Sequence, residues 1–136
     1  MTTLSQCQKK FVLKKKKHKT TPALKNRPQV KGVVMRARIM TPRKPNSAKR
    51  PIAKVILSNK RRVTAHIPGV GHNLRRHSAV LIRGGGARDL PGVYYVCIRG
   101  VYDFNTLKDR ARRRSIFGLK FPSRLNKKRR KKFRNL

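Results

Sequence analysis

Five short runs of apolar, β-branched and aromatic residues occupy the middle of the chain. They lie at residues 33–40, 52–57, 62–67, 79–82 and 93–98. The third run alternates most clearly, because Val63, Ala65 and Ile67 share one face of an extended chain. Glycine or proline separates all the runs except the second and third, between which residues 58–60 (SNK) offer a turn, and no long stretch has the 3.6-residue period of a helix. The pattern predicts an all-β fold, a small five-stranded closed barrel, with an open sheet that closes only against a partner as the alternative.

The charge pattern divides the chain into three parts. Residues 1–32 are expected to form an extended basic arm, with a short helix near residues 4–13. Residues 33–102 hold the predicted barrel, and residues 103–136 form a basic C-terminal extension. The basic clusters of arm and extension are candidate phosphate ligands: Lys14, Lys15, Lys16, Lys17, Arg112, Arg113 and Arg114.

A proline-rich stretch, residues 41–51, joins the first two predicted strands. Its three prolines fix φ, and proline cannot donate to a sheet ladder, so we expect a stiff extended loop. Asn46 and Ser47 form a small polar apex that can both donate and accept hydrogen bonds. Stiffness indicates that this apex is held in a specific place. The alternative is an ordinary exposed turn that is basic.

Two further loops interrupt the predicted strands. Residues 68–77 contain a GxG but neither a third glycine nor a following Lys-Ser/Thr, so they are no nucleotide-binding fingerprint. Residues 83–92 combine three consecutive glycines with Arg83 and Arg88. Glycine permits close backbone approach, and the arginines could clamp phosphates. A mobile hairpin connection is the alternative for this glycine-rich loop.

The large excess of basic residues indicates what kind of partner the chain binds. Lys and Arg number 39 against three acids, which gives a formal charge of +36. Such a charge cannot be neutralised within the chain, and a polyanion is the natural partner because phosphate neutralisation releases counterions. The composition therefore indicates nucleic-acid binding. A DNA-compacting nucleoid or chromatin-like protein would explain the charge as well, but not the stiff loops.

The sequence gives little support to catalysis, a metal site or a membrane span. Asp103 and Asp109 lie among arginines, so ion pairs are expected rather than a general acid. The two cysteines are far apart in sequence and form no ligand pair, and no apolar run would span a bilayer. We expect no enzyme, no cofactor, no bound metal and no membrane partner. A polyanion-cleaving enzyme is the most remote alternative, with His66, His72 or His77 as its base.

The loops resemble motifs of the small-subunit ribosomal protein twelve family. Residues 41–48 (TPRKPNSA) resemble its TPKKPNSA motif, and residues 67–74 (IPGVGHNL) resemble its IPGEGHNL. Residues 80–85 and 89–93 are similar to its VLIRGG and DLPGV. Order and spacing agree from about residue 22 to 122. Several long motifs in register are far more specific than any one of them alone.

The resemblance implies an OB-fold-like barrel with an N-terminal extension threaded through rRNA at the decoding centre of the small ribosomal subunit. It implies a structural constituent that modulates the accuracy of codon–anticodon recognition. The implied partners are small-subunit rRNA, the codon–anticodon helix of mRNA and A-site tRNA, and neighbouring small-subunit proteins. Implied decoding-centre contacts are Arg43, Lys44, Pro45, Asn46, Ser47, Lys49 and Arg50. Implied supporting contacts are His72, Asn73, Arg75, Arg76, His77, Arg83, Arg88, Asp89, Leu90, Pro91 and Gly92.

Several positions depart from the family pattern. Arg43 replaces a usual Lys, Lys49 a usual Leu, and Val70 a usual Glu. The chain has no glutamate at all, and it is rich in lysine. This bias favours an organellar ribosome, mitochondrial rather than plastid, with the bacterial cytoplasm as a further alternative.

Overall fold

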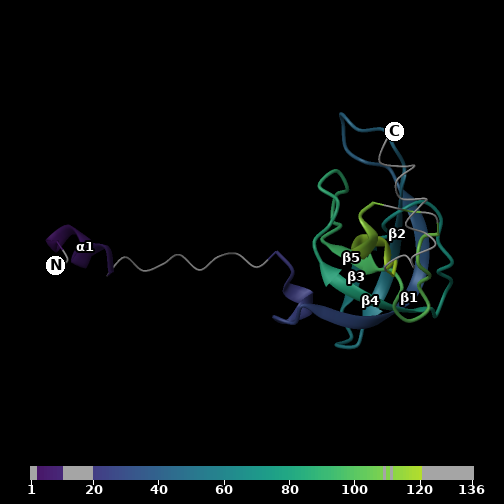
Figure 1. The fold of residues 1–136 in the computed structure, drawn as a ribbon, viewed down its shortest axis with the longest axis horizontal. Coiled ribbons are helices and arrows are strands. Elements are labelled where there is room, and N and C mark those ends of the chain that lie inside the picture. Colours follow the sequence, from purple (N-terminus) through teal and green to yellow (C-terminus); the bar gives the residue numbers. More distant parts are fainter. Residues whose placement is uncertain (1–2, 11–19, 109, 111, 121–136) are drawn as a thin grey trace.

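The computed structural model describes residues 3–10, 20–108, 110 and 112–120, and its main body is a closed five-stranded barrel (Figure 1). The strands are β1 (Gln29–Met40), β2 (Arg50–Leu57), β3 (Arg62–His66), β4 (Ala79–Gly84) and β5 (Tyr95–Ile98). The helical elements are α1 (Leu4–Lys10) and two 3₁₀ turns, η1 (Pro22–Leu24) and η2 (Arg114–Phe117). The predicted all-β barrel is therefore confirmed, and the open-sheet alternative is wrong.

The barrel closes in the order β1-β2-β3-β5-β4, with β4 returning to β1. All neighbours are antiparallel except β3 and β5, which are parallel. The long strand β1 serves both sides: residues 29–33 pair with β4, and residues 32–40 pair with β2. A register shift between Val34 and Arg36 marks a bulge, which bends β1 from one partner toward the other.

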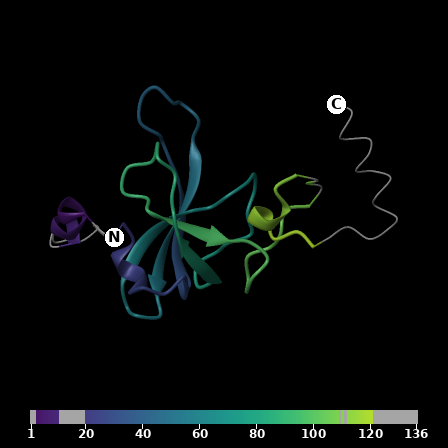
Figure 2. The same ribbon diagram turned by 60° about the vertical axis from the view of Figure 1, so that its left-hand side comes forward.

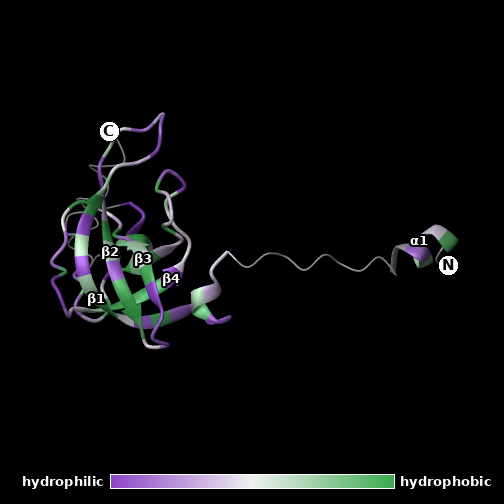
Figure 3. Cartoon of the chain, turned by 180° about the vertical axis from the view of Figure 1, so that it is seen from behind, coloured by the Kyte–Doolittle hydropathy of each residue, from purple (hydrophilic) through white to green (hydrophobic). Residues whose placement is uncertain are grey.

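The core lies inside the barrel and follows the alternation seen in the sequence. Ala65 and Ile67 are fully buried and Val63 is partly buried, so the three residues predicted to share one face do so, and that face of β3 and of the residue after it points into the core. Apolar and polar colours alternate along the strands, whereas the loops are mainly polar (Figure 3). The largest fully buried side chains include Phe104, which follows β5 and fills the barrel from its end.

Every strand differs from its predicted run at one boundary, and β3 and β4 end at His66 and Gly84 rather than at residues 67 and 82. β1 begins at Gln29 rather than at residue 33, and β5 begins at Tyr95 rather than at residue 93. Arg50 and Pro51 were assigned to the loop but belong to β2. Proline is tolerated at the beginning of a strand because its carbonyl oxygen still accepts, here from the Ile67 amide at 3.1 Å.

Part of the predicted arm packs on the barrel. Ala23 and Leu24 of η1 are buried in the core cluster. The Ala23 amide donates to the Tyr95 hydroxyl at 3.1 Å, and the Asn59 side-chain amide donates to the Ala23 carbonyl at 2.6 Å. The predicted helix near residues 4–13 corresponds to α1, and residues 11–13 lie outside the described residues. The division into arm, barrel and extension stays a prediction.

Candidate nucleic-acid interface

Two loops project side by side from one end of the barrel (Figure 2). One, shown in blue, joins β1 to β2 through residues 41–49, and the other, in green, joins β4 to β5 through residues 85–94. We call residues 41–50 and 85–93 together the two-loop tip. Six predicted contact residues of the first loop are exposed: Arg43, Lys44, Pro45, Asn46, Ser47 and Lys49.

Asp89 joins the two loops through both its side chain and its backbone. Its Oδ2 accepts from Arg50 Nε at 2.7 Å and from Asn46 Nδ2 at 3.3 Å. Its carbonyl oxygen accepts from the Arg43 amide at 2.9 Å. Three contacts from one residue orient the apex of the proline-rich loop, which disfavours its reading as an ordinary exposed turn.

The contacts of Asp89 also set its protonation. Burial acts to raise the pKa of Asp89, but hydrogen bonds from Arg50, the backbone and Asn46, together with the charge of Arg50, outweigh it and hold that pKa below its ordinary value. His66, half-buried at the end of β3, lies in the field of the same pair. Burial and then Arg50 lower the pKa of His66, and Asp89 partly opposes them.

A small apolar cluster fixes the glycine-rich loop. Leu90 and Val93 are buried with Ile52 of β2, and Met40 and Ala87 pack against them. Gly86 lies so close to the other end of the loop that a Cβ there would be 2.2 Å from the Val93 carbonyl oxygen. The loop is therefore a packed element, which disfavours its reading as a mobile connection.

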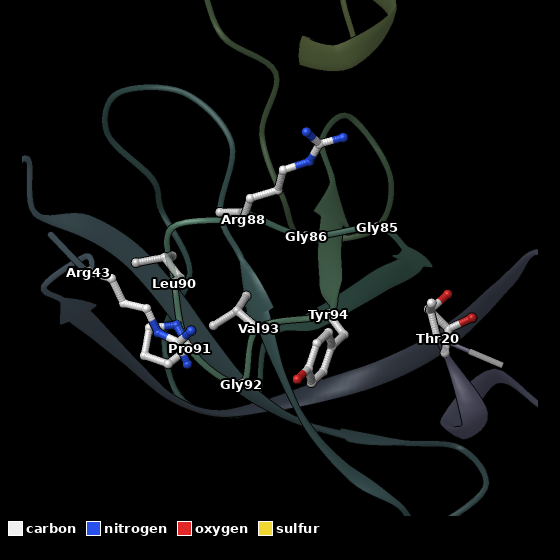
Figure 4. A pocket seen from close by; sticks show the side chains of 12 residues that line it. Thr20, Arg43, Gly85, Gly86, Arg88, Leu90, Pro91, Gly92, Val93 and Tyr94 are labelled. Carbon is white, nitrogen blue, oxygen red and sulfur yellow. The ribbon is translucent and has the colours of Figure 1, made fainter. Parts of the chain in front are cut away.

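A cavity of about 470 Å³ opens beside the tip. Figure 4 shows that Arg43 and Arg88 come from the two different loops, with Leu90 and Val93 between Arg43 and Tyr94 and with the Arg88 side chain directed away from the Tyr94 ring. Its lining residues are Thr20, Thr21, Arg43, Gly85, Gly86, Ala87, Arg88, Leu90, Pro91, Gly92, Val93 and Tyr94, and we call it the Tyr94 pocket.

The third predicted loop does not join the tip. His72, Asn73, Arg75, Arg76 and His77 are exposed, and the last three line a separate hollow along β1. Asn73 anchors this loop by donating to the Asp103 carbonyl at 2.7 Å and accepting from the Asn105 amide at 3.1 Å.

The side chain of Asp103 does not form the arginine ion pair expected from the sequence. Its Oδ2 accepts from the Ala79 amide at 2.7 Å. Within the described part of the chain, Arg50–Asp89 is the one ion pair. The Ala79 amide, brought beside Asp103 by the fold, can donate without ordering a long side chain. Asp109 lies outside the described residues.

The remaining predicted residues are scattered. Arg83 and Arg88 are exposed, Asp89 and Pro91 are partly buried, Leu90 is buried, and Gly92 is exposed with a φ of +73°. Arg112 and Arg113 are exposed, and Arg114 is partly buried at the start of η2. Lys14, Lys15, Lys16 and Lys17 lie outside the described residues.

Sequence reasoning missed Arg99 and Tyr94. Arg99 is 4% exposed, donates to the carbonyls of Pro68 (2.5 Å) and Asn105 (3.2 Å), and lies 4.4 Å from the Phe104 ring centroid. It also donates to the Gly71 carbonyl. Nothing in the sequence distinguishes this buried arginine from the many exposed ones. Tyr94 had a signal: next to a buried Tyr95, period-two alternation points it outward.

No group of three or more His, Cys, Asp or Glu within the described ranges is arranged to hold a metal ion. Among the same residues, no helix has the length and apolar character needed to cross a membrane.

Comparison with known proteins identifies the family. The model of the family "Ribosomal protein S12/S23" matches residues 16–120. The chain is 56% identical over 125 residues to "Small ribosomal subunit protein uS12m" of Paramecium tetraurelia, covering 90% of each chain. These matches confirm the predicted organellar member of this family, a structural protein and not an enzyme. The chain belongs to the ribosomal protein S12/S23 family.

Proposed function

We propose that this chain is a structural protein of the small subunit of mitochondrial ribosomes, and that its two-loop tip tunes the accuracy of codon recognition at the decoding centre. The family supports the ribosomal role, and the similarity to the uS12m protein of Paramecium tetraurelia supports the organelle. Small-subunit rRNA, the codon–anticodon helix of mRNA and A-site tRNA, and neighbouring small-subunit proteins are the proposed partners.

The observation that carries the proposal is the joining of the two loops at Asp89. A rigid apex ends in Asn46 and Ser47, which are small polar groups. RNA minor grooves are wide and shallow and display 2′-hydroxyls, which such groups can both donate to and accept from. An apex fixed in position can discriminate between two RNA geometries, whereas a flexible basic tail would follow either.

The charges around the apex fit phosphate contacts. Arg43, Lys44 and Lys49 are exposed, and the ion pair found among the described residues uses Arg50 instead. The three exposed cations are therefore available to rRNA phosphates, which position a protein on RNA without reading its sequence. The hydrogen-bonding groups of the apex then face the codon–anticodon helix.

The proposed mechanism is a bias on a conformational equilibrium. The rRNA performs the inspection, and the tip binds the open and closed states of the subunit with different free energies. A ligand or protein segment shifts such an equilibrium only by its differential affinity for the two states. Loss of one tip contact therefore changes error frequency without removing translation.

The test is the frequency of misreading in ribosomes that carry Arg43→Ala or Asn46→Ala. We expect misreading to change several-fold while the abundance of assembled small subunits stays near the wild-type level. Lys54→Ala is the matched control, because Lys54 is an exposed cation on β2 outside the tip. Near-normal misreading in subunits that contain either tip variant would contradict direct decoding contact.

A further inference from the structure

The Tyr94 pocket combines a rigid apolar wall with an exposed aromatic ring. Its wall includes Leu90 and Val93, which belong to the buried cluster with Ile52. Tyr94 is 59% exposed, although it directly precedes Tyr95, which is 6% exposed. The backbone direction at the beginning of β5 therefore sends one ring into the barrel and the other to the pocket.

The pocket is also basic and polar at its edge. Arg43 comes from the proline-rich loop and Arg88 from the glycine-rich loop, so cations from two segments line the pocket; the Arg43 guanidinium lies near Pro91, and the Arg88 side chain extends away from the Tyr94 ring (Figure 4). Thr20 and Thr21 add hydroxyl groups, and none of the lining residues is acidic. An aromatic face in a pocket edged by cations suits a group that is flat and π-rich and carries negative charge on its neighbouring atoms. A nucleotide of single-stranded RNA has these properties.

The size and rigidity of the cavity fit one such group. A volume of about 470 Å³ falls within the usual range of about 300–1,000 Å³ for small-ligand sites. Gly86 approaches the Val93 carbonyl too closely for any side chain, so the two ends of the loop are packed against each other beside the cavity. A duplex would keep its bases stacked and could not offer one to this ring.

We propose that the Tyr94 pocket binds one unstacked nucleobase of single-stranded RNA, with the base stacked on Tyr94 and the flanking phosphates contacted by Arg43 and Arg88. The inference rests on the proposed RNA-binding function, because it names the feature of the RNA that this face of the tip recognises. Tyr94 is then an RNA-contact residue. The glycine-rich loop binds RNA directly, in addition to supporting the proline-rich loop.

The experiment measures binding of the full chain to two five-residue RNA probes at one fixed salt concentration. One probe carries a single central adenine and four abasic positions, and the other has five abasic positions. Both probes carry the same charge, so phosphate binding cancels in the ratio of their affinities. Stacking on an aromatic side chain favours the adenine probe about 10-fold.

Three variants separate stacking from other effects. Tyr94→Leu should abolish the preference for the adenine probe while it leaves affinity for the abasic probe unchanged, and Tyr94→Phe should retain the preference. Tyr102→Leu is the matched control, because Tyr102 is 54% exposed but has the Lys31 ammonium 4.8 Å from its ring centroid. Thermal unfolding of each variant checks that the barrel is intact.

The proposal is overturned if wild type shows no preference for adenine, if Tyr94→Leu keeps the preference, or if Tyr102→Leu loses it equally. Each of these results would mean that RNA contacts this face through phosphates or through unspecific stacking. None of these results would decide the outcome of the misreading test, which uses Arg43 and Asn46 variants in assembled ribosomes. Conversely, a base preference that depends on Tyr94 would stand even if the decoding proposal failed.

Discussion

At the scale of single residues, Asp89 holds the tip together. One carboxylate accepts from Arg50 and Asn46, while the backbone of the same residue accepts from Arg43. The chain has only three acids, and one of them is used here. One carboxylate changes the net charge of so basic a chain very little. Its structural effect here is to orient the two loops relative to each other.

Replacing Asp89 by Asn should lower thermal stability in a pH-dependent way. The pKa of Asp89 in the folded chain lies below the ordinary value of 3.8, so its stabilising effect is complete above that value and is lost as pH falls through the folded pKa. We expect a constant gap in melting temperature between wild type and Asp89→Asn from pH 5 to 7 that closes below about pH 4. Ser47→Ala, an exposed tip variant, should show no such dependence, and a gap that persists in acid would refute the ion pair's role.

His66 should make the protein sensitive to mild acid. Burial and the nearby Arg50 hold the pKa of His66 below the ordinary 6.5, so the unfolded chain binds a proton more readily than the folded one. Stability is therefore complete above about pH 6.5 and declines as pH falls from there toward the folded pKa. Chemical denaturation between pH 7.5 and 5 should show this decline in wild type and in His72→Gln, but a smaller one in His66→Gln. Equal slopes in all three proteins would show that His66 is not the responsible group.

At the scale of elements, the glycine-rich loop depends on the contact between its two ends. In Gly86→Ala the new Cβ would meet the Val93 carbonyl oxygen at 2.2 Å, and a backbone atom cannot swing aside as a side chain can. Overpacking of this kind costs about 1–3 kcal/mol. Urea denaturation should therefore show a clear loss of stability.

The control for Gly86→Ala is Gly71→Ala. Gly71 has a φ of +73° and open space around its Cβ position. The loss of stability in Gly71→Ala should therefore come only from the left-handed backbone conformation, which costs about 1 kcal/mol for alanine. Both variants add one methyl group to a loop glycine. If Gly86→Ala lost no more stability than Gly71→Ala, the close approach to Val93 would be unimportant for the loop.

The sequence predicted elements well where a two-residue period was sufficient. Val63, Ala65 and Ile67 alternate in the sequence and face the core in the structure. The predicted strand boundaries were wrong where strand pairing extends beyond the apolar run. Gln29 and Lys31 are polar, yet they belong to β1 because β4 pairs with them. By local rules Pro51 should end a strand, but its carbonyl oxygen accepts a hydrogen bond from the Ile67 amide, which lies beyond β3 and is not visible in the local pattern.

The candidate site was predictable as a set of loops but not as an arrangement. Motif resemblance identified the loops at 41–50 and 83–92, and the structure joins them through Asp89. The loop at 72–77 belongs to the same motif set but packs elsewhere. Which loops meet is decided by barrel closure, and that closure depends on contacts between strands that are distant in sequence.

At the scale of the whole molecule, charge opposes the fold. A formal charge of +36 on 136 residues repels itself, and screening is stronger at higher ionic strength. The melting temperature of the RNA-free protein should therefore rise between about 0.05 and 0.5 M salt, while affinity for single-stranded RNA should fall over the same interval. Scanning fluorimetry and a binding titration measure the two trends. A melting temperature that stays constant or falls would show that the repulsion is already relieved within the folded chain.

The barrel closes through its shortest strand pairing. β3 and β5 share only two register pairs, Ala65 with Tyr95 and His66 with Val96. We call this pairing the seam, and we expect local opening of the barrel to begin there because it has the fewest backbone hydrogen bonds to break. Tyr94 is the residue immediately before the seam, and the Tyr95 hydroxyl accepts the hydrogen bond that holds Ala23 on the barrel. If the Tyr94 pocket binds a nucleobase as proposed, that base contacts the chain immediately beside the shortest pairing of the barrel.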